Sequence, residues 1–212
     1  MLKAVIFDLD GLLVDSTPVQ EEAFRRFVEG HGKVYLPGTS GQSGKRIIDI
    51  IREYKDLYDL PGNIGELYKE RQNIFYRLVN QSLQMFPGAL RLLDKLKQKR
   101  LELALATSGD NEYIKVLFRK YPEMEKYFSV VITSEDVARG KPFPDVFQKA
   151  LNRLGLKPED AVVIEDSING ILAAKAAGIL TICVPNRHFP DADVSIADRI
   201  FPSLEDIAQA IN

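Results

Sequence analysis

The sequence predicts an α/β fold, in which a doubly wound parallel sheet carries a small all-helical cap. A short apolar run near the N-terminus has the pattern of a buried strand, and helical periodicity then dominates residues 15–84. From residue 89 onward, predicted helices and strands alternate, which implies parallel strands joined by helical crossovers. The expected domains are therefore a core of residues 1–14 and 85–212 and an inserted helical cap of residues 15–84.

The first predicted strand starts at Ala4 and ends in Asp8 and Asp10, which are followed by Gly11. Because side chains alternate along an extended chain, the two carboxylates point the same way if the strand persists, and a loop could bring them side by side. Two like charges beside an apolar strand are costly unless a cation or a proton relieves them. A turn with a helix-capping aspartate is the plainer interpretation of this stretch taken alone.

Three amphipathic helices are expected in the cap, because apolar residues recur there at helical spacing. The first starts near Pro18, and the positions that mark it are Val19, Ala23, Phe24 and Phe27. The second and third are marked by Ile47, Ile48 and Ile51, and by Ile64, Leu67, Tyr68, Arg71, Ile74, Phe75 and Leu78. Breaks between them are expected at Gly38, Gly41, Gly44, Pro61 and Gly62.

The core should alternate helices with strands after the cap. Helices are expected at residues 89–99, 111–120, 145–154, 168–177 and 204–211. Strands are expected at residues 101–107, 130–133, 161–165 and 180–184, with a short edge strand at Ile200. In a sheet of this kind, ligands bind at the carboxyl ends of the strands.

Polar side chains gather at those strand ends. Thr107 and Ser108 end the second strand, Glu165 and Asp166 end the fourth, and Lys141 precedes the fourth. Each has an ordinary structural explanation, because hydroxyl and acidic residues cap helices and a lone lysine is usually solvated. Their convergence at strand ends that are predicted independently favours one polar site.

This set of side chains suits phosphoryl chemistry with a divalent cation. Carboxylate oxygens are ligands that Mg²⁺ prefers, and Asp8, Asp10 and Asp166 could supply them. The Thr107 hydroxyl and the Lys141 ammonium could hold phosphate oxygens. One aspartate is then free to act as nucleophile and its neighbour as general acid and base, through an aspartyl-phosphate intermediate.

Four short motifs follow one another along the chain: DLDGLLVDS at residues 8–16, LATS at 105–108, GKPFPD at 140–145 and VIEDS at 163–167. With them, nearly the whole chain resembles the haloacid dehalogenase superfamily of Mg²⁺-dependent phosphohydrolases, whose core is Rossmann-like. The resemblance is to the subgroup that includes beta-phosphoglucomutase and sugar-phosphate phosphatases. Leu12 stands where the family more often has threonine or valine, and we expect no loss of chemistry from it.

The resemblance implies a role for each matching residue. Asp8 would be the nucleophile and Asp10 the general acid and base, while Thr107, Ser108 and Lys141 would bind the phosphate.

The same resemblance implies a metal site with Mg²⁺ as the cofactor. Its ligands would come from Asp8, Asp10 and Asp166, with Glu165 ligating the ion or supporting the ligands. The helical insert would be the family's small cap, which closes over the substrate and excludes water.

Cap residues favour hydrolysis over a mutase reaction. Beta-phosphoglucomutases, which this chain resembles, carry a histidine in the first cap helix where this chain has Gln20. They also carry an arginine near Ser43 of this chain, where the closest match is Gly44. His31 and His188 match neither position and are expected at the surface or in loops. We therefore expect a phosphatase for a small phosphorylated metabolite, with a sugar phosphate as one candidate and a sugar phosphomutase as the alternative.

Residues 38–46 form a glycine-rich stretch that superficially resembles a nucleotide-binding phosphate loop. Its outer glycines are one residue too far apart, and Arg46 stands where Ser or Thr should bind Mg²⁺. A cap loop that faces the active site is the better interpretation. The candidates for contacting the substrate beyond its phosphate are Gln20, Gln42, Ser43, Lys45 and Arg46.

Two further classes of function stay open. A haloacid dehalogenase would share the fold and the nucleophilic aspartate, but it needs no metal and would leave Asp10, Glu165 and Asp166 unexplained. In a binding protein without catalytic activity, the catalytic residue types at every position of the four motifs would have no function.

Composition narrows the expected partners. The net charge is −2 and no segment is strongly basic, so no nucleic-acid partner is expected. No stretch approaches a membrane span and no signal peptide precedes the first strand, so we expect a cytoplasmic protein without a membrane partner. The one cysteine, Cys183, lies in an apolar run and is expected in the core. One chain can complete the site, so a monomer would suffice.

Overall fold

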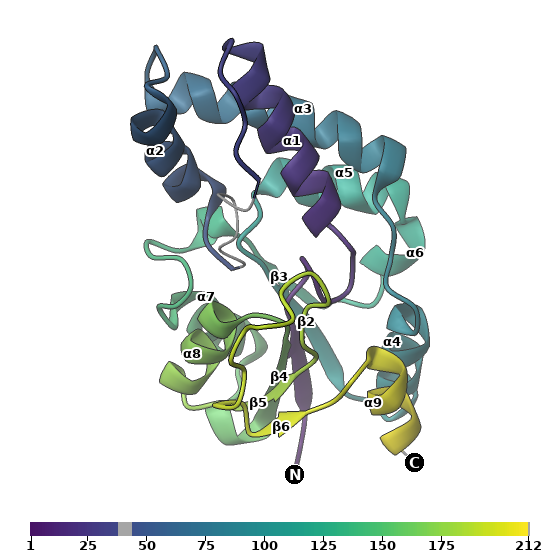
Figure 1. Ribbon diagram of the computed structural model, residues 1–212. Helices are drawn as coiled ribbons and strands as arrows, with labels where there is room; N and C mark the ends of the chain where they lie inside the picture. The colour runs from purple at the N-terminus through teal and green to yellow at the C-terminus, as the bar shows by residue number, and fades with distance from the viewer. Residues whose placement is uncertain (38–43, 212) are drawn as a thin grey trace.

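A six-stranded parallel sheet lies at the centre of the computed structural model, which describes residues 1–37 and 44–211. The strand order is β3-β2-β1-β4-β5-β6, and the N-terminus lies at the lower end of the sheet in Figure 1. The strands are β1 (Ala4–Phe7), β2 (Glu102–Ala106), β3 (Val130–Ile132), β4 (Ala161–Glu165), β5 (Leu180–Cys183) and β6 (Arg199–Ile200). Because β1 pairs with both β2 and β4, the carboxyl ends of these three strands are neighbours at one edge of the sheet.

Helices pack against both faces of the sheet, and others form a cap. In chain order the helices are α1 (Thr17–Gly30), α2 (Ile47–Tyr58), α3 (Ile64–Ser82), α4 (Ala89–Gln98), α5 (Asn111–Lys120), α6 (Pro122–Glu125), α7 (Asp145–Leu154), α8 (Ile168–Ala176) and α9 (Leu204–Ala210). Alternate side chains of β1 point to opposite faces. Val5 and Phe7 pack in a core with α4, α5 and α9, whereas Ala4 and Ile6 pack in a second core with α7 and α8. The predicted doubly wound α/β fold is therefore confirmed.

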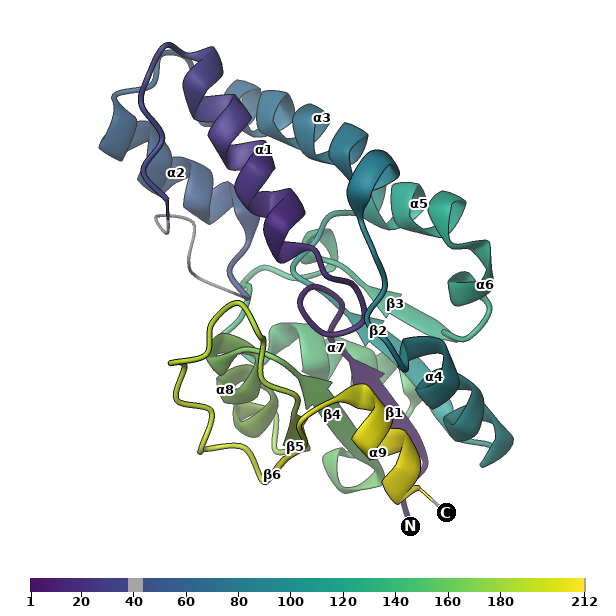
Figure 2. The same cartoon turned by 45° about the vertical axis from the view of Figure 1, so that its right-hand side comes forward.

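The cap consists of α1, α2 and α3, which lie together beyond the carboxyl ends of the strands (Figure 2). These helices bury an apolar cluster of their own, which includes Phe24, Phe27, Ile51 and Tyr54. A reciprocal capping box starts α3, because the Asn63 side chain accepts a hydrogen bond from the Glu66 backbone N–H and the Glu66 carboxylate accepts one from the Asn63 N–H. The inserted helical cap is thus present, and the domain boundaries at residues 14 and 84 stay a prediction.

Most element limits agree closely with the expectations from periodicity. The strand β4 and the helices α5 and α7 have the predicted limits, and the edge strand expected at Ile200 is β6. Three short elements were not predicted, because they are too brief to display a period: α6 and the 3₁₀ turns Ser134–Asp136 and Pro158–Asp160. Cys183 is buried, as expected. Within the described part of the chain, no helix combines the length and the apolar character needed to cross a membrane.

A buried carboxylate joins the cap to the core. Asp110 caps α5 by accepting a hydrogen bond from the backbone N–H of Tyr113 at 2.8 Å. Its oxygens also accept hydrogen bonds from side chains one helical turn apart on α3, namely the hydroxyls of Tyr68 and Tyr76 and the amide of Gln72. We call these four side chains the Asp110 clamp. The clamp holds α3 against the start of α5, next to the end of β2.

The clamp predicts a large stability effect. Asp110→Ala should lower the free energy of unfolding by about 2–4 kcal/mol, because two buried donors and two half-buried hydroxyls lose their acceptor together. Asp94→Ala is the matched control, since exposed Asp94 accepts one phenol hydrogen bond, from Tyr127 at 2.6 Å. The control should cost less than about 1.5 kcal/mol. Urea unfolding of both variants measures the difference, and equal losses would contradict the clamp.

Candidate active site

The loop after β1 turns two aspartates toward the edge of the sheet. Leu9, Leu12 and Leu13 of this loop are buried in the core, and the Leu9 carbonyl accepts the backbone N–H of Leu13 at 2.9 Å. Gly11 has a φ of +84°, and a Cβ there would lie 2.1 Å from Oδ2 of Asp166. The turn therefore requires glycine, both for its backbone and for the close approach of the fourth motif.

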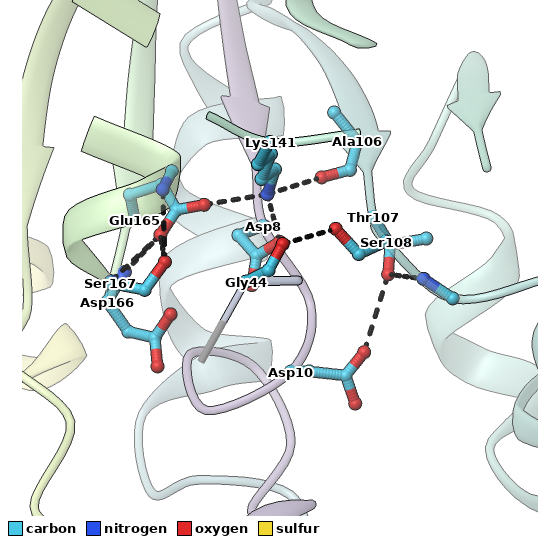
Figure 3. Close-up of polar contacts among 12 residues, drawn as sticks. Asp8, Asp10, Gly44, Ala106, Thr107, Ser108, Lys141, Glu165, Asp166 and Ser167 are labelled. Carbon is cyan, nitrogen blue, oxygen red and sulfur yellow. Dashed lines mark hydrogen bonds and ion pairs between the residues drawn. The ribbon is translucent and has the colours of Figure 1, made fainter. Parts of the chain in front are cut away.

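Lys141 connects two of the acidic residues. Its Nζ lies 2.5 Å from Oδ1 of Asp8 and 2.6 Å from Oε1 of Glu165, and it donates to the Ala106 carbonyl at 3.2 Å (Figure 3). The Lys141 side chain is 1% exposed, so these ion pairs are made in a desolvated environment. They place one cation among the ends of β1, β2 and β4.

Glu165 acts mainly as an acceptor for its own turn. Its Oε2 accepts the backbone N–H groups of Asp166 and Ser167 at 2.8 and 2.9 Å and the Ser167 hydroxyl at 2.9 Å. Its Oε1 binds Lys141. Gly170 makes room for the carboxylate, since a Cβ there would lie 1.7 Å from Oε1. Both oxygens of Glu165 are thus already bonded to protein donors.

Three carboxylates could hold a metal ion together. Asp8, Glu165 and Asp166 each offer an oxygen, and these oxygens lie within 4.8 Å of one another. Oδ2 of Asp166 accepts the Asn186 amide at 2.7 Å, whereas Oδ1 is buried and, within the described residues, has no hydrogen-bond partner. An orphaned buried oxygen in an all-carboxylate group fits a hard divalent cation.

Asp10 is separate from this group. Its Oδ1 accepts the Tyr113 hydroxyl at 2.8 Å and its Oδ2 faces the Thr107 hydroxyl at 3.4 Å. In Figure 3, Asp10 lies on the Thr107 side of Asp8 and Asp166 lies on the other side. The structure therefore does not bring the Asp10 carboxylate into the acidic group that could hold the metal.

Burial dominates the electrostatics of the site. It raises the pKa of Asp8 to about 7, an effect that Lys141 opposes and that Glu165 and Asp10 reinforce. Burial, Glu165 and Asp8 raise the pKa of Asp166 well above its usual range. For Lys141, burial lowers the pKa, but the charges of Asp8 and Glu165 outweigh it and hold the pKa above its ordinary value. The acids exceed the one lysine, so a further cation would relieve their repulsion.

A cavity of about 390 Å³ opens above Asp8 and Asp10. Core residues, including Ser108, line its floor, and cap residues, including Gln20 and Lys45, line its roof. The lining consists of Asp8, Asp10, Ser16, Thr17, Pro18, Gln20, Glu21, Phe24, Gly44, Lys45, Ile47, Ile50, Ser108, Gly109, His188 and Phe189. The Ser108 hydroxyl donates to the Gly44 carbonyl of the cap at 2.8 Å, so core and cap touch at the cavity wall (Figure 3).

The predicted cap contacts divide into three groups. Gln20 and Lys45 line the cavity, and Lys45 also pairs with Glu53 at 2.7 Å. Arg46 is not among the lining residues, because it donates to the Ala138 carbonyl at 3.0 Å and lies against Gly140. Gln42 and Ser43 lie outside the described residues.

Several site residues escaped the sequence analysis. His188, which was expected at the surface or in a loop, is on the loop after β5 but lines the cavity, where its Nε2 lies 2.7 Å from Oδ1 of Asp15. Asn186, from the same loop, binds Asp166. The position of both after a parallel strand was the available signal. Tyr113 had no such signal, because on its helix it counts as one more apolar-face residue.

The raised pKa of Asp8 predicts the direction in which the free energy of unfolding of the metal-free protein changes with pH. The unfolded chain loses this proton near the ordinary value of 3.8, whereas the folded chain keeps it up to a pKa of about 7. Between those values the folded state binds more protons, so this group makes the free energy of unfolding fall as pH rises from 3.8 to about 7.

Urea unfolding of the wild type and of Asp8→Asn, in EDTA and at several pH values, tests this pH dependence of stability. The variant lacks the titrating group, so the wild type should lose stability relative to it across this pH window and show no further relative loss above it. A difference between the two proteins that stays constant with pH would contradict the assignment.

Comparison with known proteins places the chain in a family. The family model for haloacid dehalogenase-like hydrolases matches residues 2–178. A phosphorylated carbohydrates phosphatase from Thermotoga maritima is 37% identical over 185 residues, which cover 84% of this chain and 82% of that protein. The structure of CbbY from Rhodobacter sphaeroides in complex with phosphate has a TM-score of 0.85 and 26% identity, and the match covers 98% of this chain and 96% of that one.

A Thermotoga maritima structure described as a candidate beta-phosphoglucomutase is similar as well. It has a TM-score of 0.76 and 30% identity, and the match covers 99% of this chain and 98% of that one. The family model spans most of the chain, and the curated relative from Thermotoga maritima is a phosphatase. The chain therefore belongs to the haloacid dehalogenase-like hydrolase family and is a phosphoric monoester hydrolase.

Proposed function

We propose that this protein is a Mg²⁺-dependent phosphatase for a small phosphorylated metabolite, with phosphorylated sugars as the preferred class. The observation that carries the proposal is the position of Asp8, on the floor of the cavity between Lys141 and the Asp166 oxygen that has no partner among residues 1–37 and 44–211. A carboxylate held there can reach a phosphorus atom that enters from the cavity. The Thermotoga phosphatase of phosphorylated carbohydrates supports the substrate class.

Asp8 is the proposed nucleophile. Its carboxylate attacks phosphorus, the bond from phosphorus to the substrate oxygen breaks, and the phosphoryl group is left on Asp8 as an aspartyl phosphate. Lys141 holds the attacking carboxylate in place and stabilises the charge of the transferring group, with Ser108 at the cavity wall as a further phosphate contact. Thr107 contributes through the hydroxyl that it directs to Asp10.

Asp10 is the proposed general acid and base. It gives a proton to the departing substrate oxygen and then takes one from the water that attacks the aspartyl phosphate, so that phosphate is released and Asp8 is regenerated. Burial raises the pKa of Asp10, which favours the protonated form that the first step needs. Its position apart from the acidic group leaves it free for this exchange.

Asp8 and Asp166 would hold the metal, supported by Glu165 and Asn186. Mg²⁺ supplies charge neutralisation for the carboxylates and for the phosphate oxygens when it is bound. The buried Asp166 oxygen, which lacks a hydrogen-bond partner in the described part of the chain, supports this site. Glu165 is the weaker candidate ligand, because protein donors already use both of its oxygens.

The roof of the cavity bears on the choice between phosphatase and mutase. Gln20 lines the cavity, and its side-chain oxygen accepts a hydrogen bond from the buried Arg71. Such an amide cannot exchange protons as a histidine can, which supports hydrolysis. A sugar phosphomutase of the beta-phosphoglucomutase type is the second candidate, favoured by the similarity to the Thermotoga structure described in those terms. One chain supplies every group named above, so a monomer would suffice. The proposed location is the cytoplasm.

Asp8→Asn should reduce phosphate release by at least ~10³-fold, because it removes the nucleophile while keeping its shape. The assay covers sugar phosphates, nucleoside monophosphates and small phosphorylated acids, each with Mg²⁺ and with EDTA. Asp94→Asn, at an exposed aspartate, should keep full activity. EDTA should abolish wild-type turnover and added Mg²⁺ should restore it.

Three results would count against the proposal. Substantial activity in Asp8→Asn would exclude the nucleophile, and full activity in EDTA would exclude the metal. Efficient conversion of beta-glucose 1-phosphate to an isomeric sugar phosphate, with little phosphate release, would establish the mutase instead.

A further inference from the structure

The hydroxyl of Tyr113 lies against the proposed general acid and base. It donates to Oδ1 of Asp10 at 2.8 Å, and the Tyr113 side chain is buried. The other oxygen of Asp10, Oδ2, faces the Thr107 hydroxyl at the longer distance of 3.4 Å. We propose that Tyr113 is a positioning residue, which fixes the Asp10 carboxylate so that Oδ2 carries the exchanged proton. This inference rests on the proposed function.

The backbone and the ring of Tyr113 are both held in place. Its backbone N–H donates to Asp110 at the start of α5, and its ring packs edge-on against Phe75 of α3 with centroids 4.9 Å apart. Gly109 makes room beside it, because a Cβ at position 109 would lie 2.7 Å from Cδ1 of Tyr113. The ring is therefore held from the core and from the cap, and its hydroxyl has little freedom to leave Asp10.

The hydrogen bond decides which oxygen of Asp10 can act. A carboxyl group that could rotate would offer either oxygen to the substrate, and only part of its conformations would be productive. Tyr113 occupies Oδ1 as a donor, so rotation would break a part-buried hydrogen bond of 2.8 Å. Ser16 and Thr107 also hydrogen-bond to the Asp10 carboxylate, and we assign the proton to Oδ2, whose contact with Thr107 is the longer one at 3.4 Å.

In the first step the Oδ2–H bond breaks, and its proton joins the leaving oxygen while the bond from that oxygen to phosphorus breaks and Asp8 bonds to phosphorus. In the second step a water oxygen bonds to phosphorus, its proton returns to Oδ2, and the bond from Asp8 to phosphorus breaks. Tyr113 keeps its own proton throughout, which agrees with the burial that raises its pKa well above its usual range.

Tyr113→Phe tests this role on a pair of esters of similar size. Benzyl phosphate has an alkoxide leaving group that needs the proton from Asp10, whereas p-nitrophenyl phosphate has a stable leaving group that does not. The variant should lose roughly 10- to 100-fold in kcat/KM on benzyl phosphate and less than about 3-fold on p-nitrophenyl phosphate.

Tyr127→Phe is the matched control. It also removes a phenol hydrogen bond to a carboxylate, from Tyr127 to Asp94 at 2.6 Å, but away from the cavity lining. It should change neither kcat/KM value by more than about 2-fold, and urea unfolding shows whether the two variants are comparably folded.

Equal losses on the two esters in Tyr113→Phe, or no loss on either, would overturn the role of Tyr113. Failure of the proposed function would look different, because turnover of both esters by the wild type would then be absent or would survive Asp8→Asn. A loss confined to benzyl phosphate supports the inference.

Discussion

The buried ion pairs of Lys141 are the constraint on which the rest of the site depends. Its ammonium binds Asp8 from the end of β1, Glu165 from the end of β4 and the Ala106 carbonyl from the end of β2. Burying a charge is expensive unless partners surround it, and removing one partner from such a pair typically costs several kcal/mol. The lysine thus couples the stability of the sheet edge to the position of Asp8, the proposed nucleophile.

The same arrangement divides the acidic residues by task. Glu165 uses its oxygens to bind Lys141 and to hold the turn that presents Asp166, and one buried Asp166 oxygen has no hydrogen-bond partner among the described residues. Asp10 lies on the other side of Asp8 and is held by Tyr113. In the proposed function, a metal side and a proton-transfer side therefore flank Asp8, the attacking carboxylate. The cap supplies the roof of the cavity and, through the Asp110 clamp and the Phe75 ring, also steadies the proton-transfer side.

Much of this could be predicted from the sequence, because parallel strands gather their ends at one edge. That rule brings Asp8, Glu165 and Asp166 together, and the side chains of β1, all of them buried, alternate between the two cores. What could not be predicted depends on packing between elements far apart in the chain. The Tyr113 hydroxyl reaches Asp10 from α5, and its ring packs against Phe75 of α3. The residue pattern of α5 alone does not indicate either contact. The position of Asp10 apart from the other acids could not be predicted either, because it depends on the geometry of the loop after β1. The spacing of Asp8 and Asp10 in the sequence does not determine that geometry.

The central claim, that Asp8 forms a covalent bond to phosphorus, can be tested by chemical trapping. Turnover of p-nitrophenyl phosphate in the presence of Mg²⁺ is quenched in acid and treated with borohydride, which reduces an aspartyl phosphate to homoserine. Peptide mapping by mass spectrometry then locates the change. The account predicts homoserine at position 8, dependent on substrate, and at no other aspartate. Homoserine elsewhere, or rapid phosphate release with no reducible acyl phosphate at any time point, would contradict it.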